Sequence, residues 1–305
     1  MKREKTGFTL VELLTVLAII AMLVGLLIPS LTMIRNTARR AKQKAQFTEI
    51  GLALTAFRND YGDYPPSNWL TPPGDYCGAQ KLAEALLGWD LMGFHPKSAW
   101  RADGLDAGGR EFSYDPAKLR DVDGDGVPDT FSERRGPYLE LATTNAFRLG
   151  INPARPDPDG LFINSTPLNP DRYVICDSFG VKKVTLISGE IVKAGTPILY
   201  YRANTASKSI EPPAIFDDRI YNVRDNMPLT TQLTSIVDGT VHRLGLAAGN
   251  YEIFYGNPAT GVIGYIQDPK VSARLWPYRP DSYILISAGV DGLYGTPDDI
   301  RNFGN

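Results

Sequence analysis

Apolar residues fill the first part of the chain and then recur with the period of a helix. From Leu13 to Ile34 the sequence has 22 consecutive residues without a charge. An α-helix needs about 20 apolar residues to cross the hydrocarbon core of a bilayer, so this run is long enough to span a membrane. Further apolar residues follow at spacings of three and four, in Phe47, Ile50, Leu54, Phe57 and Tyr61. This stripe predicts one long helix that continues to Tyr61, because a glycine and two prolines follow soon after.

The pattern changes after the helix to short runs separated by turn residues. Residues 79–89 predict a short amphipathic helix, and residues 137–151 a further helical turn. Short runs rich in β-branched and aromatic residues predict strands at residues 172–175, 184–187, 197–202, 251–255 and 283–287. We therefore expect an α+β fold, in which a long N-terminal helix packs on a mainly antiparallel β-sheet head. A large loop-rich insertion, at about residues 67–280, belongs to this head.

Composition and charge narrow the classes of function. The net charge of −2 gives no basic footprint for a nucleic-acid partner. The sequence has only two histidines, and it contains no HExxH zinc motif, Gly-x-Ser-x-Gly elbow or phosphate-binding loop. We therefore expect a protein that is not an enzyme. Two alternatives stay open: a membrane-tethered hydrolase with a carboxylate pair, and a calcium-dependent adhesin, which an exposed patch of Trp69, Trp89 and Trp100 would favour.

A short motif at the N-terminus carries the closest resemblance to a known family. The sequence Lys-Thr-Gly-Phe-Thr-Leu-Val-Glu, from Lys5 to Glu12, precedes and opens the apolar run. It resembles the signal of type IV prepilins and of type II secretion pseudopilins. The resemblance implies cleavage between Gly7 and Phe8 by prepilin peptidase, followed by N-methylation of the Phe8 amine. Pro29 matches the helix-kinking proline that is common in this family.

The same resemblance implies how the subunit assembles. Glu12 lies at the edge of an apolar helix, where a carboxylate is costly. The new amine of Phe8 in a neighbouring subunit would be its partner, in a charge-assisted and partly desolvated pair. The alternative is a carboxylate solvated in the headgroup layer. The expected partners are prepilin peptidase/N-methyltransferase, other pilin-like subunits, an inner-membrane assembly platform and membrane lipid.

These expectations divide the chain into four parts. They are a leader at residues 1–7, a membrane and assembly helix at 8–34, the periplasmic half of the helix at 35–61, and a pilin-like head at 62–305. The protein would be a single-pass inner-membrane protein of a bacterium, with its head in the periplasm and later in a filament. A count of basic residues on each side of the apolar run favours the reverse orientation, and the resemblance overrules it. The N-terminus does not distinguish type II secretion from a type IV pilus, or a major from a minor subunit.

An acidic loop in the middle of the chain predicts a calcium site. Carboxylates occupy positions 1, 3, 5 and 9 of an EF-hand-type loop that has glycine at position 6. The glutamate expected at position 12 is replaced by Ser132. A solvated acidic turn is the alternative. The candidate ligands are Asp121, Asp123, Asp125, Val127 (position 7) and Asp129.

A second acidic loop lies near the C-terminus. There, Ser287 to Asp299 has the pattern Ser-x-Gly-x-Asp-Gly-x-x-Gly-Thr-x-Asp-Asp and resembles the calcium loop of major type II pseudopilins. That resemblance makes Asp291, Asp298 and Asp299 candidate side-chain ligands of Ca²⁺, with Leu293 and Thr296 as weaker ones. Carboxylates crowded without a cation would repel one another, although a surface turn with solvated aspartates remains the alternative.

The two cysteines allow one disulfide. Cys77 and Cys176 could pair if the head lies outside the cytosol. Two free buried thiols are the alternative.

Overall fold

The computed structural model describes residues 10–69, 75–105, 114, 133–154, 159–186, 188–210, 218–244, 251–257 and 260–304. The chain divides into two compact units, Met1–Lys42 and Gln43–Asn305. The second unit therefore contains the end of the long helix together with the expected head, residues 62–305.

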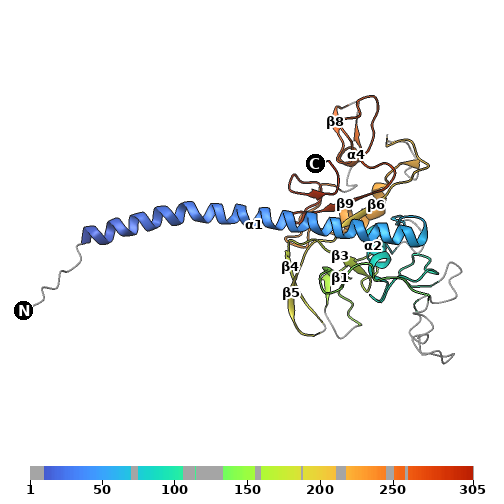
Figure 1. The fold of residues 1–305 in the computed structure, drawn as a ribbon, viewed down its shortest axis with the longest axis horizontal. Helices are drawn as coiled ribbons and strands as arrows, with labels where there is room; N and C mark the ends of the chain where they lie inside the picture. The colour runs from blue at the N-terminus through green and yellow to red at the C-terminus, as the bar shows by residue number, and fades with distance from the viewer. Residues whose placement is uncertain are drawn as a thin grey trace, which may run out of the picture. The chain divides into compact units, whose positions relative to one another are not determined.

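Helix α1, Leu10–Tyr61, is one continuous helix of 52 residues (Figure 1). It ends where the sequence predicts, and Gly62, with a φ of 83°, donates its N–H to the carbonyl of Arg58 at 2.7 Å. The apolar side chains described between Leu10 and Ile34 are exposed. Across the described part of the chain, no helix has both the length and the apolar character needed to cross a bilayer. The structure thus leaves the predicted membrane span unconfirmed.

The C-terminal part of α1 packs into the core of the second unit. Phe47, Ile50, Leu54 and Phe57 are almost fully buried, and they cluster with side chains from strands and a second helix. The apolar stripe therefore faces the head, as predicted. The partners in this cluster include Leu82, Leu86, Ile198, Tyr200, Tyr283, Leu285 and Ile300.

Helix α2, Gly78–Leu87, is buried along its whole length. The backbone N–H of Cys77 is capped by the side-chain oxygen of Gln80 at 3.2 Å. Leu82 and Leu86 lie four residues apart and join the cluster around α1, while Ala79 joins a second core cluster. The predicted helix at residues 79–89 is confirmed, with its end shifted by two residues.

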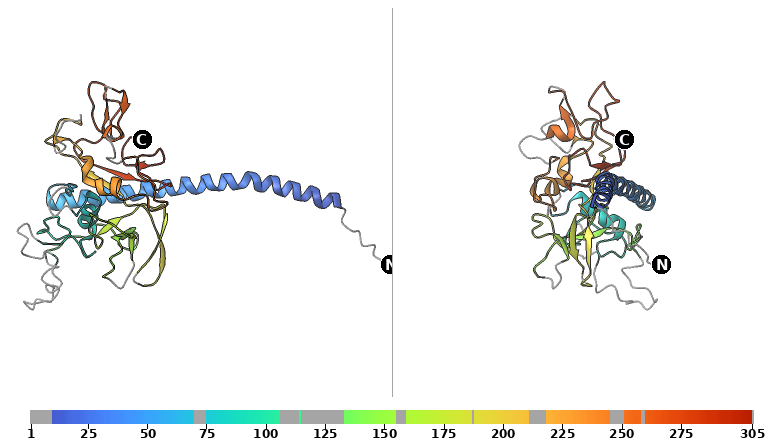
Figure 2. Two further views of the ribbon diagram at one scale, coloured as in Figure 1. Left: turned by 180° about the vertical axis from the view of Figure 1, so that it is seen from behind. Right: turned by 90° about the vertical axis from the view of Figure 1, so that its left-hand side faces the viewer.

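Within the described residues, the strands form four small sheets (Figures 1 and 2). Strands β6 and β9 pair in antiparallel fashion from Leu199↔Ile286 to Arg202↔Tyr283, and β10 continues this sheet on the other side of β9. The second three-stranded sheet has the order β2-β1-β3, in which β1 and β2 are parallel and β1 and β3 antiparallel. Antiparallel pairing dominates, so the structure confirms the α+β class. The strands are β1 Ala146–Gly150, β2 Gly160–Phe162, β3 Tyr173–Ile175, β4 Lys182–Thr185, β5 Ile191–Ala194, β6 Leu199–Arg202, β7 Gly256–Asn257, β8 Val262–Ile263, β9 Tyr283–Ser287 and β10 Ile300–Arg301.

One strand prediction is wrong. The aromatic run at residues 251–255, predicted as a strand, is the short helix α4, Tyr251–Tyr255. Phe254 and Tyr255 are buried in the core, so tertiary contacts override the local preference of this run. The helical turn expected within residues 137–151 is present, since the N–H of Thr144 donates to the carbonyl of Glu140 at 3.0 Å. The end of that range is strand β1, which pairs with β3.

Two short helices complete the described fold. Val223–Asn226 is a 3₁₀ turn whose N-cap, Asn222, accepts the N–H of Arg224 at 3.0 Å. The next segment, Pro228–Gln232, is a π-helical turn with its proline at the start, where a missing N–H costs nothing. Together they place Asp225 and Asn226 in the buried layer beside β6 and α2.

Candidate functional site

The C-terminal acidic loop connects β9 to β10, and the structure brings its predicted ligands together. Gly289, Gly292 and Gly295 all have positive φ angles, between 68° and 90°. A Cβ atom on Gly289 would lie 2.5 Å from both the carbonyl oxygen and Oδ2 of Asp298. Glycine is therefore required there by conformation and by space, since the chain folds back against its own aspartate.

Asp298 is the centre of this loop. Its Oδ2 accepts the backbone N–H groups of Val290 at 2.7 Å and Asp291 at 3.1 Å, and its Oδ1 accepts the hydroxyl of Thr296 at 2.6 Å. Burial opposes the charge of Asp298, but these hydrogen bonds outweigh it and hold the pKa of Asp298 below its ordinary value. The loop is thus organised around an ionised carboxylate.

More oxygens gather at Thr296 than its hydroxyl can satisfy. Its Oγ1 lies 2.6 Å from Asp298 Oδ1, 3.2 Å from the carbonyl oxygen of Leu293 and 3.3 Å from Asp299 Oδ1. A hydroxyl has a single proton to donate, so at most one of these acceptors receives it. The remaining oxygens form the kind of oxygen-rich set that a hard cation favours.

The flanking aspartates complete the set. Asp291 Oδ1 accepts the N–H of Leu293 at 2.8 Å, and burial raises the pKa of Asp291. Asp299 Oδ2 accepts the N–H of Gly295 at 2.8 Å and the hydroxyl of Tyr265. Burial raises the pKa of Asp299 to about 7. All five residues predicted as ligands in this loop therefore lie within one network of contacts.

No group of three His, Cys, Asp or Glu side chains suited to a metal ion occurs in the described ranges. A cation at this loop would therefore need the Leu293 carbonyl and the Thr296 hydroxyl as well as carboxylates. The other predicted calcium site, Asp121 to Asp129, lies outside the described residues.

Sequence reasoning missed a support beneath the loop. Asp177, which follows β3 by two residues, is fully buried and accepts the hydroxyl of Ser287 at 2.9 Å. Ser287 Oγ in turn lies 3.3 Å from the N–H of Gly289, at the first turn of the loop. Burial raises the pKa of Asp177 to about 7. The only sequence signal is a lone aspartate after an apolar strand, which by itself indicates nothing.

The structure describes only some of the residues singled out at the N-terminus. Gly7 and Phe8 lie outside the described residues. Glu12 lies in the first turn of α1, where the helix dipole favours a carboxylate, and its carbonyl accepts the hydroxyl of Thr15 at 3.0 Å. The helix continues through Pro29.

The two cysteines do not form the disulfide that the sequence allowed. Cys77 and Cys176 are both free thiols with no exposed surface, and both belong to the same apolar cluster. Burial raises the pKa of Cys77 to about 11 and that of Cys176 well above its ordinary value. Each acts as a small apolar side chain, the alternative that the sequence had left open.

The aromatic residues proposed for an adhesin surface pack against their neighbours. Trp69 and Trp100 are partly buried against the two core clusters. Trp89 stacks on Tyr114 and lies beneath the guanidinium of Arg172, whose Cζ is 3.3 Å from the ring centroid. These positions favour a scaffold over an aromatic binding patch.

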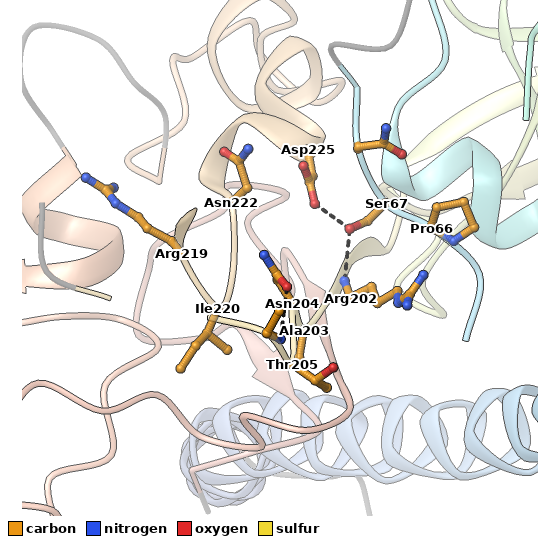
Figure 3. Close-up of a pocket in the computed structure, with 12 residues that line it drawn as sticks. Pro66, Ser67, Arg202, Ala203, Asn204, Thr205, Arg219, Ile220, Asn222 and Asp225 are labelled. Carbon is orange, nitrogen blue, oxygen red and sulfur yellow. Dashed lines mark hydrogen bonds between the residues drawn. The ribbon is translucent and has the colours of Figure 1, made fainter. Parts of the chain in front are cut away.

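A polar hollow of about 460 Å³ opens between the segment after α1 and the strand β6 (Figure 3). The hydroxyl of Ser67 lies at its wall, donating to the carboxylate of Asp225 and accepting the N–H of Arg202 at 3.0 Å. Both Ser67 and Asp225 are buried, and this pair links the segment after α1 to the 3₁₀ turn. The two histidines are not among the residues that line this hollow.

A comparison with protein families now places the N-terminal segment. Residues 2–28 match the family model of the prokaryotic N-terminal methylation motif. This motif is the hallmark of type IV pilins and pseudopilins, so the match supports a pilin-like N-terminus. The motif implies processing by prepilin peptidase and assembly with other pilin subunits. No curated protein and no solved structure matches the chain.

Proposed function

We propose that this protein is a structural subunit of a type II secretion or type IV pilus filament. Prepilin peptidase cuts it between Gly7 and Phe8, and the N-terminal helix then anchors it in the inner membrane and mediates polymerisation. The observation that carries this proposal is the methylation motif at residues 2–28, which includes the first part of α1.

The organisation of α1 supports this role. Apolar side chains along its first part are exposed, so they are available to lipid or to other helices. Its last turns are buried in the head. One helix thus joins a segment with exposed apolar side chains to the folded head, as a polymerising subunit requires. The tryptophans pack into their surroundings, so no described observation favours the adhesin alternative.

Processing provides the first test. Gly7→Glu should leave an uncut precursor, because a bulky charged residue replaces the small residue at the cut. The measurement is the intact mass of the membrane-extracted protein, which should drop by the mass of the leader in the wild type and in the control but not in Gly7→Glu. Ser188→Glu is the control, since Ser188 is exposed on the head and the change adds the same charge away from the cut. A wild-type mature chain that begins at a residue other than Phe8 would contradict the proposal.

Assembly provides the second test. Glu12→Leu should leave the protein in the membrane fraction but reduce its incorporation into filaments, because the Phe8 amine of the next subunit loses its partner. Glu49→Leu removes an exposed carboxylate from the same helix and serves as the control. Equal incorporation of Glu12→Leu and Glu49→Leu would reject the pairing.

We also propose that calcium stabilises the head through the loop between β9 and β10. Asp291, Asp298 and Asp299 would supply carboxylate oxygens, with the Leu293 carbonyl and the Thr296 hydroxyl beside them. The crowded acceptors around Thr296 support this proposal. A bound calcium ion would coordinate the acceptor oxygens that receive no proton from the Thr296 hydroxyl. Because it would bind the folded head, it would stabilise the fold by mass action.

The test compares melting temperatures of the full-length protein in a mild detergent, with calcium and with a chelator. The double substitution Asp298→Ala, Asp299→Ala should remove part of the chelator effect, and the rest should persist if Asp121 to Asp129 is a second site. The control removes two aspartates elsewhere, Asp238 and Asp268, each of which accepts a local backbone N–H. A double variant that responds to calcium and chelator as the wild type does would exclude this loop.

A further inference from the structure

A groove of about 480 Å³ runs along the head part of α1. One wall of the groove is α1 from Lys44 to Thr55. The other wall comes from Arg279 before β9, Tyr283 at the start of β9, and the end of β10 with the residue after it. Gly51 lets the two sides approach closely, since a Cβ atom there would lie 3.1 Å from the hydroxyl of Tyr283. We call this feature the basic groove; its lining residues are Lys44, Phe47, Thr48, Gly51, Leu52, Thr55, Arg279, Tyr283, Arg301 and Asn302.

Three cations line the basic groove, and none of its lining residues is acidic. Lys44 comes from the helix, Arg279 from the segment before β9 and Arg301 from the end of β10. Among the described residues, none of the three takes part in an ion pair with a carboxylate. Positive charge is therefore concentrated in a concave surface without an internal counterion.

The two arginines are held in place while most of their donors stay available. Arg279 lies over the Tyr283 ring at 4.8 Å, and its hydrogen bonds to the Asn302 carbonyl and the Ser282 hydroxyl are long, at 3.4 Å. Arg301 lies over the Tyr265 ring at 4.8 Å and donates to the Tyr265 carbonyl at 3.1 Å. A guanidinium has five N–H donors, so both keep donors for a carboxylate or another anion.

The backbone of Arg279 supports a role beyond packing. Its φ is 51°, in the left-handed region that a non-glycine residue adopts only with backbone strain. Such strain persists where the surrounding structure enforces it, and it concentrates at binding surfaces. Here it accompanies the placement of a guanidinium over Tyr283 at the groove.

The other lining groups favour a peptide over a phosphate. The hydroxyls of Thr48 and Thr55 donate to helix carbonyls at 3.1 Å and 2.8 Å, which leaves their lone pairs to accept N–H groups. A peptide offers such N–H donors, whereas a phosphate diester has none. Leu52, which is 68% exposed, adds an apolar contact for a side chain between the carboxylates.

We propose that the basic groove docks an acidic, extended segment of another protein chain, whose carboxylates bind Lys44, Arg279 and Arg301. The proposal does not depend on the filament role, because it rests on the head alone. Exposed charge pairs are individually weak and are screened by salt, so three pairs give a weak, salt-sensitive contact suited to reversible docking.

The experiment measures the binding of a short fluorescent oligo-aspartate peptide to the full-length protein in neutral detergent, by anisotropy. An oligo-glutamine peptide of equal length should not bind. Lys44→Glu should weaken binding about fivefold or more, which corresponds to roughly 1 kcal/mol. Lys208→Glu reverses an exposed lysine outside the groove and should have no effect.

A triple variant, Lys44→Gln, Arg279→Gln and Arg301→Gln, should abolish the binding, and its melting curve shows whether it folds. Even if it fails to fold, the comparison of Lys44→Glu with Lys208→Glu decides the matter, because Lys44 is exposed and its side chain supports no described contact. Equal effects of these two single variants would overturn the proposal. Displacement of the peptide by inorganic phosphate or glycerol phosphate at equal concentration would also overturn it, because the groove would then be a phosphate site.

Discussion

Truncation of one buried side chain on α1 tests whether this helix is part of the head. Leu54 has no exposed surface and lies in the cluster that joins α1 to α2 and β9, whereas Leu52 on the same helix is 68% exposed. Leu54→Ala and Leu52→Ala make the same change in helix propensity, so their difference isolates burial.

The expected magnitude follows from the burial of each side chain. Removing a fully buried leucine side chain costs about 2–5 kcal/mol, from lost transfer energy and the cavity that remains. We expect about 3 kcal/mol for Leu54→Ala and at most about 0.5 kcal/mol for Leu52→Ala. For a domain of this size, 3 kcal/mol lowers the melting temperature by about 6–12 °C.

The assay is thermal unfolding of the full-length protein in a mild detergent, followed by near-UV circular dichroism, which reports the aromatic packing around Phe57. That ring contacts Tyr61, Phe94, Trp100 and Tyr138. If Leu54→Ala and Leu52→Ala unfold at the same temperature, the C-terminal part of α1 does not contribute to the core, and the packing argument fails.

Two further predictions concern the head. Burial lowers the pKa of His242 from 6.5 to about 4, so the folded state favours the neutral ring. The resulting contribution of His242 to the free energy of unfolding, up to about 3 kcal/mol, is complete above pH 6.5. It is lost as the pH falls from 6.5 towards 4, because the unfolded state then binds a proton that the folded state does not. His242→Gln should flatten the fall in unfolding free energy between pH 7 and pH 4, measured by urea titration, and an unchanged slope would contradict the assignment. Gly289→Ala should destabilise the head more than Gly261→Ala, because both have positive φ but only Gly289 would place a Cβ against Asp298. Equal melting temperatures of these two variants would show that the close approach at Asp298 does not exist.

Local patterns were enough to predict several elements. The stripe from Phe47 to Tyr61 predicts the buried face of α1 and its end, because a helical face repeats every three to four residues within one short segment. Strand β9 has the predicted bounds, since a run of β-branched and aromatic residues is followed by glycine. The methylation motif is likewise one continuous segment of the sequence, so it can be identified without a structure.

The acidic loop between β9 and β10 could be predicted only in part from the sequence. Its resemblance to the pseudopilin calcium loop pointed to five residues, and the structure places these five in one network of contacts. The spacing did not show that Thr296 Oγ1 lies among three acceptors, because those distances depend on the fold of the loop. The support from Asp177 was invisible for a different reason: 110 positions separate it from Ser287 in the chain.

Tertiary structure alone decided the remaining features. The run at 251–255 has the composition of a strand, yet it folds as the short helix α4, with Phe254 and Tyr255 in the core. The cysteines remain separate thiols because each fills an apolar position in that core. The basic groove needs a helix, the segment before β9 and the end of β10 side by side. Sequence patterns report interactions between near neighbours in the chain, whereas these features arise from contacts between residues that only folding brings together.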